Sequence, residues 1–300
     1  MPKALSPLDL AVPRNKTALM LQLQFLVCRT GYRMWCGGVI CRTKLAAFIT
    51  KMAARYPITR STRQRTYDRK RGIAVVHFMA YAVGDKVHWW LLSDAGKGGL
   101  ADKSSEDARV ARDAMSADGH IIFGDYVLVY ATKREWREVQ CPKTKKPRGF
   151  HKQTSTWTWK LRTEVMRELK HGIELCCEHL EYGSEGGNGK KAWGLRGLLA
   201  TMRSRPLFSG VRSQVLELHR DARDLWKPRR PLWCERYPAH VEKYKQNAGA
   251  LTPIGVVMAN ELPKIPRMKV YAQPPETLRG IIADVAPEVL TVVGDKNVSH

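Results

Sequence analysis

The chain has 300 residues, 44% of them hydrophobic, which is enough to bury a core and excludes wholesale disorder. Lys and Arg number 51 against 28 Asp and Glu, which gives a formal net charge of +23 and a pI near 9.9. An excess of this size repels itself and is typical of proteins that bind an anionic partner, whether nucleic acid, an anionic membrane face or an acidic protein.

The sequence lacks the features of a membrane protein. No run of about 18 apolar residues is present, and residues 1–16 lack the charged-then-apolar order of a signal peptide. Seven cysteines, an odd number without a repeated short spacing, indicate free thiols rather than a zinc site. We therefore expect a cytoplasmic protein without a membrane partner, a metal or a cofactor.

The first part of the chain predicts an arm, a strand and a helix. Residues 1–16 contain prolines and no period, which predicts an N-terminal arm. Residues 17–29 place leucines at every second position, which favours a strand. In residues 42–57 the apolar residues recur at helical spacing and Pro57 ends the helix.

The segment 59–72 reads TRSTRQRTYDRKRG and has six Lys or Arg against one Asp, without a large aliphatic residue. This composition predicts a charged loop. Residues 73–83 and 86–93 then predict a hairpin around Gly84 and Asp85.

Two further elements follow the hairpin. Residues 104–119 begin with Ser and acidic residues and end at Gly119, which predicts a helix. Residues 120–133 predict a fourth strand.

The predicted order is strand, helix, strand, strand, helix, strand. This α+β order is ferredoxin-like (βαββαβ), an antiparallel sheet with both helices on one face and the other face free. Over residues 17–133 it resembles the RNA-recognition motif and the RNA-binding and RNA-processing subunits of CRISPR complexes, although the aromatic-and-glycine signature of that motif is absent. Fold alone does not settle function.

Residues 133–162 contain ten Lys or Arg and two Glu, and they predict a basic β-hairpin that extends this domain, so that the domain spans residues 17–162. Residues 163–247 predict a helical region. In it Val165, Leu169, Ile173, Cys176 and Leu180 form one stripe, and residues 192–203, 209–226 and 238–247 give further helices separated by Pro206 and Pro228. Residues 248–300 predict a proline-spaced tail with strand-like residues near Leu290.

Positive charge is clustered along the chain. Residues 59–72 carry +5, residues 133–162 carry +8 and residues 190–236 carry +8, whereas residues 93–125 carry −3 and residues 164–188 carry −4. Clustered cations suit a polyanion because each neutralised phosphate releases counterions. We expect a nucleic-acid-binding protein, with RNA or a single strand favoured over DNA because an open sheet with aromatics suits unpaired bases, and other subunits of a ribonucleoprotein complex as further partners.

The residues expected to hold the backbone or stack on bases lie in the three basic runs. They are Arg60, Arg63, Arg65, Arg69, Lys70, Arg71, Lys143, Lys145, Lys146, Arg148, Lys152, Trp157, Trp159, Lys190, Lys191 and Arg196.

Three alternatives stay open. The first is a metal-independent endoribonuclease of the CRISPR RNA-processing type, with His77, His88 and Tyr81 as candidate acid–base residues. The second is a duplex DNA-binding protein whose helix-turn-helix comprises residues 192–203 and 209–226. The third is a scaffold for an acidic protein. The glycine-rich stretches at 95–99 and 184–191 do not match the spacing of a nucleotide-binding P-loop.

Overall fold

The computed structural model shows a mixed α+β protein with antiparallel sheets. It describes residues 5–103, 105–140, 147–178, 194–236, 238, 254–258, 260–265 and 276–283, without the side chains of 133–137, 139, 147, 148, 150–152 and 236. The chain divides into two compact units. The first comprises residues 1–121, 128–157 and 267–300, and the second comprises residues 122–127 and 158–266.

The first unit contains an antiparallel sheet of four strands in the order β3-β4-β2-β5. Its strands are β2 (Met34–Cys41), β3 (Val76–Val83), β4 (Lys86–Ser93) and β5 (Arg112–Asp113). The predicted hairpin is confirmed, since β3 pairs with β4 from Val83↔Lys86 to Val76↔Ser93 and Gly84 supplies the turn with φ +60°.

The predicted first strand at residues 17–29 is wrong, because this segment is helix α1 (Lys16–Arg29). The segment is apolar on nearly every side, so a period of two and a period of 3.6 fit it equally well. Its leucines favour a helix, and Asn15 caps it by accepting the Ala18 N–H at 2.8 Å. The first strand is instead β2, which begins within residues 30–38, a stretch whose sequence suggests a corner and not a strand.

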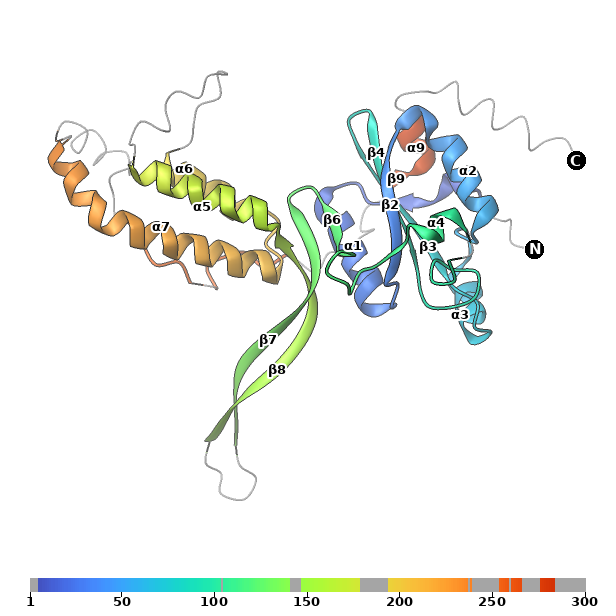
Figure 1. Cartoon of the computed structure of the whole chain (residues 1–300), viewed down its shortest axis with the longest axis horizontal. Coiled ribbons are helices and arrows are strands. Elements are labelled where there is room, and N and C mark those ends of the chain that lie inside the picture. Colours follow the sequence, from blue (N-terminus) through green and yellow to red (C-terminus); the bar gives the residue numbers. More distant parts are fainter. Residues whose placement is uncertain are drawn as a thin grey trace, which may run out of the picture. The chain divides into compact units, whose positions relative to one another are not determined.

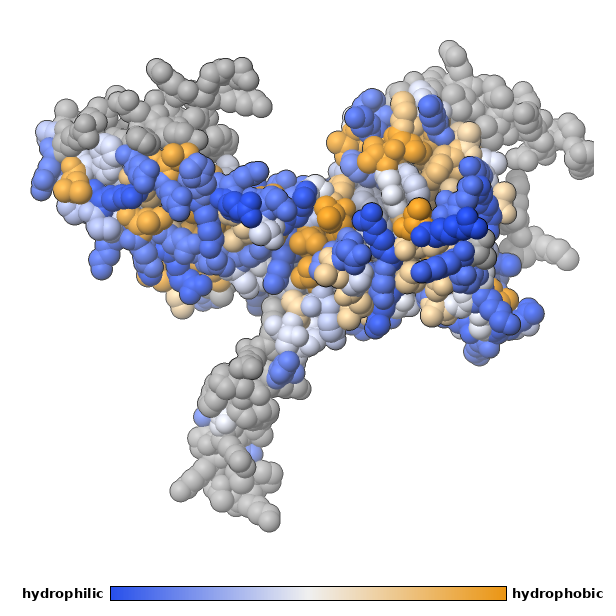
Figure 2. Space-filling model, in the orientation of Figure 1, coloured by the Kyte–Doolittle hydropathy of each residue, from blue (hydrophilic) through white to orange (hydrophobic). Residues whose placement is uncertain are grey.

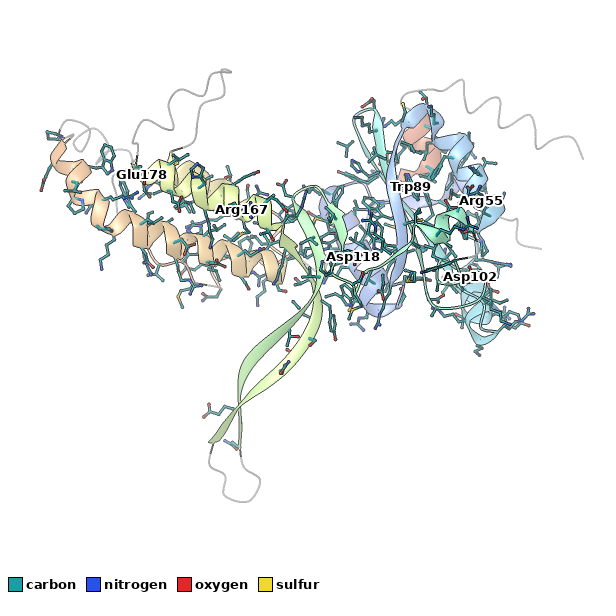
Figure 3. All side chains as sticks on the ribbon, viewed as in Figure 1. Arg55, Trp89, Asp102, Asp118, Arg167 and Glu178 are labelled. Atoms are coloured by element: carbon teal, nitrogen blue, oxygen red, sulfur yellow. The ribbon has the colours of Figure 1, made fainter. Side chains whose placement is uncertain are left out.

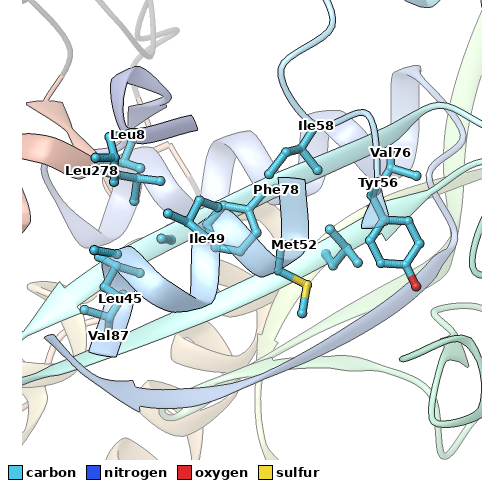
Figure 4. Close-up of a cluster of buried hydrophobic side chains, with 14 of the residues drawn as sticks. Leu8, Leu45, Ile49, Met52, Tyr56, Ile58, Val76, Phe78, Val87 and Leu278 are labelled. Atoms are coloured by element: carbon cyan, nitrogen blue, oxygen red, sulfur yellow. The ribbon is translucent and has the colours of Figure 1, made fainter. Parts of the chain in front are cut away.

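Helix α2 (Leu45–Arg55) follows the short η2 (Arg42–Lys44) and confirms the helix predicted at residues 42–57. The buried face of α2 packs on the sheet together with residues from segments near the two ends of the described chain (Figure 4). Those end segments are η1 (Pro7–Asp9), β1 (Ala11–Val12), β9 (Glu276–Thr277) and α9 (Leu278–Ala283), and β1 pairs with β9. The core cluster includes Leu8, Leu45, Ile49, Met52, Phe78, Val87, Leu91, Leu278 and Ile281.

The segment after β4 differs from the prediction in two ways. The helix expected at 104–119 is reduced to α4 (Glu106–Arg109), followed by the two residues of β5. Arg55 of α2, labelled in Figure 3, donates to Asp107 of α4 at 2.8 Å and holds this short helix.

The strand predicted at residues 120–133 does not join this sheet, which corrects its assignment as the fourth strand. A turn at Gly124, with φ +55°, divides it into β6 (Ile121–Phe123) and β7 (Tyr126–Gln140). These strands form a separate sheet with β8 (Pro147–Leu161) in the order β6-β7-β8. The predicted long hairpin is confirmed, and β7 and β8 twist around each other as a two-stranded ribbon (Figure 1).

Three helices form most of the described second unit: α5 (Thr163–Glu178), α6 (Leu195–Arg203) and α7 (Ser209–Arg236). The helix predicted at residues 209–226 is confirmed as part of α7, in which Val211, Val215, Leu218 and Ala222 are fully buried. The break expected at Pro228 is wrong, since α7 continues through Pro228 and Pro231, both exposed. Leu180 and nearly all of the helix predicted at 238–247, like the strand-like residues near Leu290, lie outside the described residues.

Helix α7 begins in close contact with β8. The hydroxyl of Thr158 accepts the Gly210 N–H at 3.0 Å, and the Gln214 amide both accepts from and donates to the backbone of Leu161, at 2.7 and 3.1 Å. A Cβ on Gly210 would lie 2.5 Å from the carbonyl oxygen of Trp159. A glycine is therefore needed where the helix meets the strand.

Replacing Gly210 with Ala tests this close contact. We expect the free energy of unfolding to fall by roughly 1–3 kcal/mol, because the helix must move away from β8. Gly172→Ala in α5 is the matched control: its Cβ would meet only the flexible end of Leu198 at 3.4 Å, so stability should stay unchanged or rise by up to about 1 kcal/mol. Urea unfolding followed by circular dichroism measures both, and equal stabilities would contradict the contact.

Candidate nucleic-acid interface

The arginine-rich segment is a helix, α3 (Thr62–Lys70), and not the predicted loop. Its start is fixed by a capping box. The Ser61 hydroxyl accepts the Gln64 N–H at 3.3 Å, and the Gln64 side chain accepts the Ser61 N–H at 2.8 Å. Ser followed three residues later by Gln is a sequence signal for a helix start that the prediction missed.

The end of α3 is fixed by Gly72, whose φ is +70°. The N–H of Gly72 donates to the carbonyl of Arg69, and the N–H of Ile73 donates to the carbonyl of Asp68, each at 3.0 Å. This pair of bonds is a Schellman motif, which favours glycine at the left-handed position. The cations Arg69 and Lys70 lie in the last turn, where the helix dipole stabilises positive charge.

One side of α3 is held by the rest of the first unit. Arg69 donates to Asp94 at 2.8 Å, and its guanidinium lies 5.2 Å from the centre of the Tyr32 ring. The other carboxylate oxygen of Asp94 accepts the Val75 N–H at 2.7 Å. Asp94 therefore links α3 to the segment that enters β3.

Two more of the predicted cations are engaged internally. Arg60 lies 3.5 Å from the carboxylate of Asp68, which is buried, and Arg65 donates to the carbonyl of Ile58 at 3.3 Å. Arg60, Arg65 and Arg69 thus have partners within the protein.

The opposite side of α3 carries the remaining cations around an exposed aromatic ring. Arg63, Tyr67, Lys70 and Arg71 follow the spacing of one helical face and are all exposed. Tyr67 is 60% exposed, and the guanidinium of Arg71 lies 5.6 Å from the centre of its ring. Arg63, Lys70 and Arg71 have no carboxylate partner in the part of the chain that the structure describes. We call these four residues the outer face of α3; hydrophilic side chains cover this region in Figure 2.

Few of the cations predicted on the basic hairpin lie in the part of the chain that the structure describes. Lys143, Lys145 and Lys146 lie outside the described residues, and the side chains of Arg148 and Lys152 are not described. Trp157 and Trp159 are 4% and 0% exposed, so the prediction that they stack on bases is wrong. Trp157 instead packs against Tyr130, with ring centres 5.4 Å apart, and Trp159 packs against Phe208 at 6.3 Å.

Three cations of the third basic run are paired with acids of their own unit. Arg205 pairs with Asp125 at 2.7 Å, Arg223 with Asp224 at 2.9 Å, and Arg229 with Glu178 at 3.3 Å. Lys190 and Lys191 lie outside the described residues, and Arg196 is exposed on α6.

The sheet face opposite α2 is covered over part of its area. Trp90 and Leu92 are buried there, while Val39 and Val83 are each 50% exposed. On the α2 face Trp89, labelled in Figure 3, is half-buried and packs against Phe48 with ring centres 4.8 Å apart. The tryptophans of β4 therefore do not supply the open aromatic face expected for unpaired bases, because both are packed.

The two candidate histidines are far apart on the covered face. Tyr81 lies directly opposite His88, whereas His77 lies opposite Leu92. Four residues of β4 separate the two pairs, which is about 13 Å. The structure does not bring His77 and His88 together on one phosphate group.

His77 is an unusual histidine. Its ring stacks on Tyr32 with centres 6.1 Å apart, and its Nδ1 is buried without a hydrogen-bond partner among the described residues. Burial, and then the charge of Arg65, lower the pKa of His77 to about 3. Burial, and then Lys86, also lower the pKa of His88.

The glycine-rich segment 95–99 has a packing role. A Cβ on Gly96 would lie 2.5 Å from the backbone nitrogen of Ala74, and one on Gly99 would lie 2.5 Å from the Ala74 Cβ. The bridge between Ile73 and Lys97 needs this close approach. These glycines therefore hold the segment that follows α3.

Comparison with known proteins gives no relative: no family model, no curated protein and no solved structure matches this chain. Across the described residues, no helix has the length and apolar character needed to cross a bilayer. No group of three or more His, Cys, Asp or Glu side chains able to hold a metal ion occurs within those same residues.

Asp94→Asn tests the link between α3 and the sheet. An amide can keep one of the two hydrogen bonds but loses the ion pair with Arg69. We therefore expect the free energy of unfolding to fall by roughly 1–3 kcal/mol. Limited trypsin digestion should then cleave within α3 at least several-fold faster. Asp118→Asn, at an exposed position, is the control, and equal cleavage of the two variants would show that Asp94 does not hold α3.

The low pKa of His77 predicts a specific dependence of stability on pH. Between about pH 6.5 and pH 3 the unfolded chain binds a proton at this histidine and the folded protein does not. The free energy of unfolding should therefore fall as the pH is lowered through this range. Urea unfolding at several pH values should give a shallower fall for His77→Phe than for the wild type, and parallel curves would rule out a depressed pKa.

Proposed function

We propose that the protein binds nucleic acid, RNA or another single strand in preference to duplex DNA, and that the outer face of α3 holds the phosphate backbone. The observation that carries the proposal is the division of α3 into two sides. Arg60, Arg65 and Arg69, on the inner side, have partners in the protein. Arg63, Lys70 and Arg71, on the outer face, are exposed and have no carboxylate partner among the described residues.

The geometry of this face suits a polyanion. Arg63 and Lys70 are seven residues apart, or two helical turns, which is about 10 Å. Phosphates repeat every few Å along a strand, so cations one or two turns apart can each meet one. Guanidinium groups also bind phosphate oxygens through two parallel hydrogen bonds.

We also propose that the sheet of the first unit is a ferredoxin-like core. Read across the sheet, the neighbouring strands are the second, third, first and fourth in chain order, and all neighbours are antiparallel. Helices α2 and α4 then occupy the two crossover positions, and α3 is an addition between α2 and the second strand. This arrangement supports the βαββαβ order with different residues in its first and last strands than the sequence predicted.

The enzymatic alternative has less support. A metal-independent ribonuclease needs an acid and a base at one phosphate, and His77 lies about 13 Å along the strands from the opposed pair Tyr81 and His88. A group with a pKa of about 3 is also a poor base at neutral pH. The helix-turn-helix alternative would use α7, whose cations Arg223 and Arg229 are paired with acids.

The test compares two triple variants that remove equal charge. Arg63→Gln/Lys70→Gln/Arg71→Gln removes the cations of the outer face, and Lys44→Gln/Lys51→Gln/Arg109→Gln removes three exposed cations elsewhere in the same unit. Binding of a labelled 20-nucleotide RNA is measured by fluorescence anisotropy at several salt concentrations. We expect the first variant to bind at least about tenfold more weakly near 0.1 M salt, with a slope of log affinity against log salt reduced by about 2.

The control variant should keep the slope of the wild type. Equal losses in both variants would mean that the charge acts through the whole molecule and not through α3. A wild-type protein that binds neither RNA nor DNA at about 0.15 M salt would contradict the proposed function and favour an acidic protein partner.

A further inference from the structure

The outer face of α3 has an aromatic ring at its centre. Tyr67 is 60% exposed, although tyrosine is a large side chain with an apolar ring. Its neighbours one turn away are cations: Arg63 precedes it by four residues, and Lys70 and Arg71 follow it by three and four. A helix that served only to carry charge would not need a large ring among its cations.

The ring is held and remains accessible. Arg71 lies over it at 5.6 Å, a distance typical of a cation–π contact. A single guanidinium can cover one face of the ring, and the exposure of the side chain leaves surface for a second planar group. Arg71 is itself positioned, because it is the C-cap residue before Gly72 in the Schellman motif.

We propose that Tyr67 stacks on one unpaired base while Arg63 and Lys70 hold the phosphates on either side of that nucleotide. The inference rests on the proposed function and adds to it the class of ligand: a single strand, RNA or DNA, with a base turned toward the protein. In a duplex the bases are stacked on each other and cannot reach a ring on a convex helix. Phosphates of a duplex can still meet the cations, so the aromatic ring makes the distinction between the two ligands.

The spacing supports this reading. Arg63 and Lys70 lie about one turn before and one turn after Tyr67, which is roughly 5 Å in each direction along the helix. The phosphates that flank one nucleotide are closer together than the roughly 10 Å between these two positions, and the long side chains of Arg63 and Lys70 can cover the difference. Base–aromatic stacking needs no particular base, so we expect little dependence on sequence.

The test separates the ring from the charges. Tyr67→Leu removes the aromatic ring and keeps every cation, Tyr67→Phe keeps the ring, and Arg63→Gln/Lys70→Gln keeps the ring and removes two cations. Four labelled 20-mer probes are compared by anisotropy: an unstructured RNA strand, its DNA counterpart, an RNA duplex, and a strand of the same backbone built from abasic nucleotides. Circular dichroism melts confirm that the variants, all at exposed positions, remain folded.

For the RNA strand, Tyr67→Leu should weaken binding roughly 5- to 150-fold, the effect of one base–aromatic stack. Tyr67→Phe should stay within about threefold of the wild type. Tyr67→Leu should bind the duplex and the abasic strand as the wild type does, with an unchanged salt slope. If Tyr67→Leu weakens the binding of the RNA strand and the DNA strand equally, the result supports stacking on either nucleic acid. If it weakens the binding of the RNA strand alone, the result supports an RNA-specific site.

Two results would overturn the inference and leave the proposed function in place. One is a Tyr67→Leu protein that binds the RNA strand as well as the wild type, while Arg63→Gln/Lys70→Gln binds it more weakly. The other is an equal loss of single-strand, duplex and abasic binding in Tyr67→Leu. A wild type that binds none of the four probes would instead contradict the proposed function itself.

Discussion

The proposed interface depends on the two hydrogen bonds that the carboxylate of Asp94 accepts. Helix α3 has no apolar side with which to pack, so burial of hydrophobic surface contributes little to its position. Asp94 accepts hydrogen bonds from Arg69 and from the backbone of Val75, and so ties α3 to the strand that follows it. Because one carboxylate neutralises one cation, the same contact that positions the helix leaves the charges on its other side for a partner.

The sequence predicted those elements whose pattern allowed one interpretation. The hairpin of β3 and β4 has a Gly-Asp turn between apolar runs, and α2 has a clear helical stripe that stops before Pro57. The segment of α1 was misread because apolar residues on all sides carry no period. The segment of β2 was misread because Gly37 and Gly38 lower strand propensity; a Cβ at Gly37 would lie 2.6 Å from the Trp89 carbonyl, which explains why a glycine stands there.

The proposed interface lies in a segment that the sequence singles out by its charge, but the local structure of that segment differs from the predicted loop. The clustered charge at 59–72 is visible in the sequence. The helix within it was not predicted because α3 has no apolar stripe. Ser61, Gln64 and Gly72 were sufficient local signals for both ends of α3. The division into inner and outer cations could not be predicted, because it depends on Asp94, which lies 25 residues from Arg69 along the chain.

The net charge of a run in the sequence does not tell how many of its cations are left for a partner. The run at 190–236 carries +8, yet Arg205, Arg223 and Arg229 meet carboxylates, and one of these, Asp125, comes from the distant β6–β7 turn. The run at 59–72 carries only +5 but presents three cations without a described carboxylate partner on one face. The rigidity of α3 adds to this difference between the two charge runs. A capped helix with a guanidinium already placed over Tyr67 loses less conformational entropy on binding than a charged loop would, so a smaller number of contacts can give the same affinity. The caps that a loop prediction overlooked are thus the features that make a short, highly charged segment suitable as a binding surface.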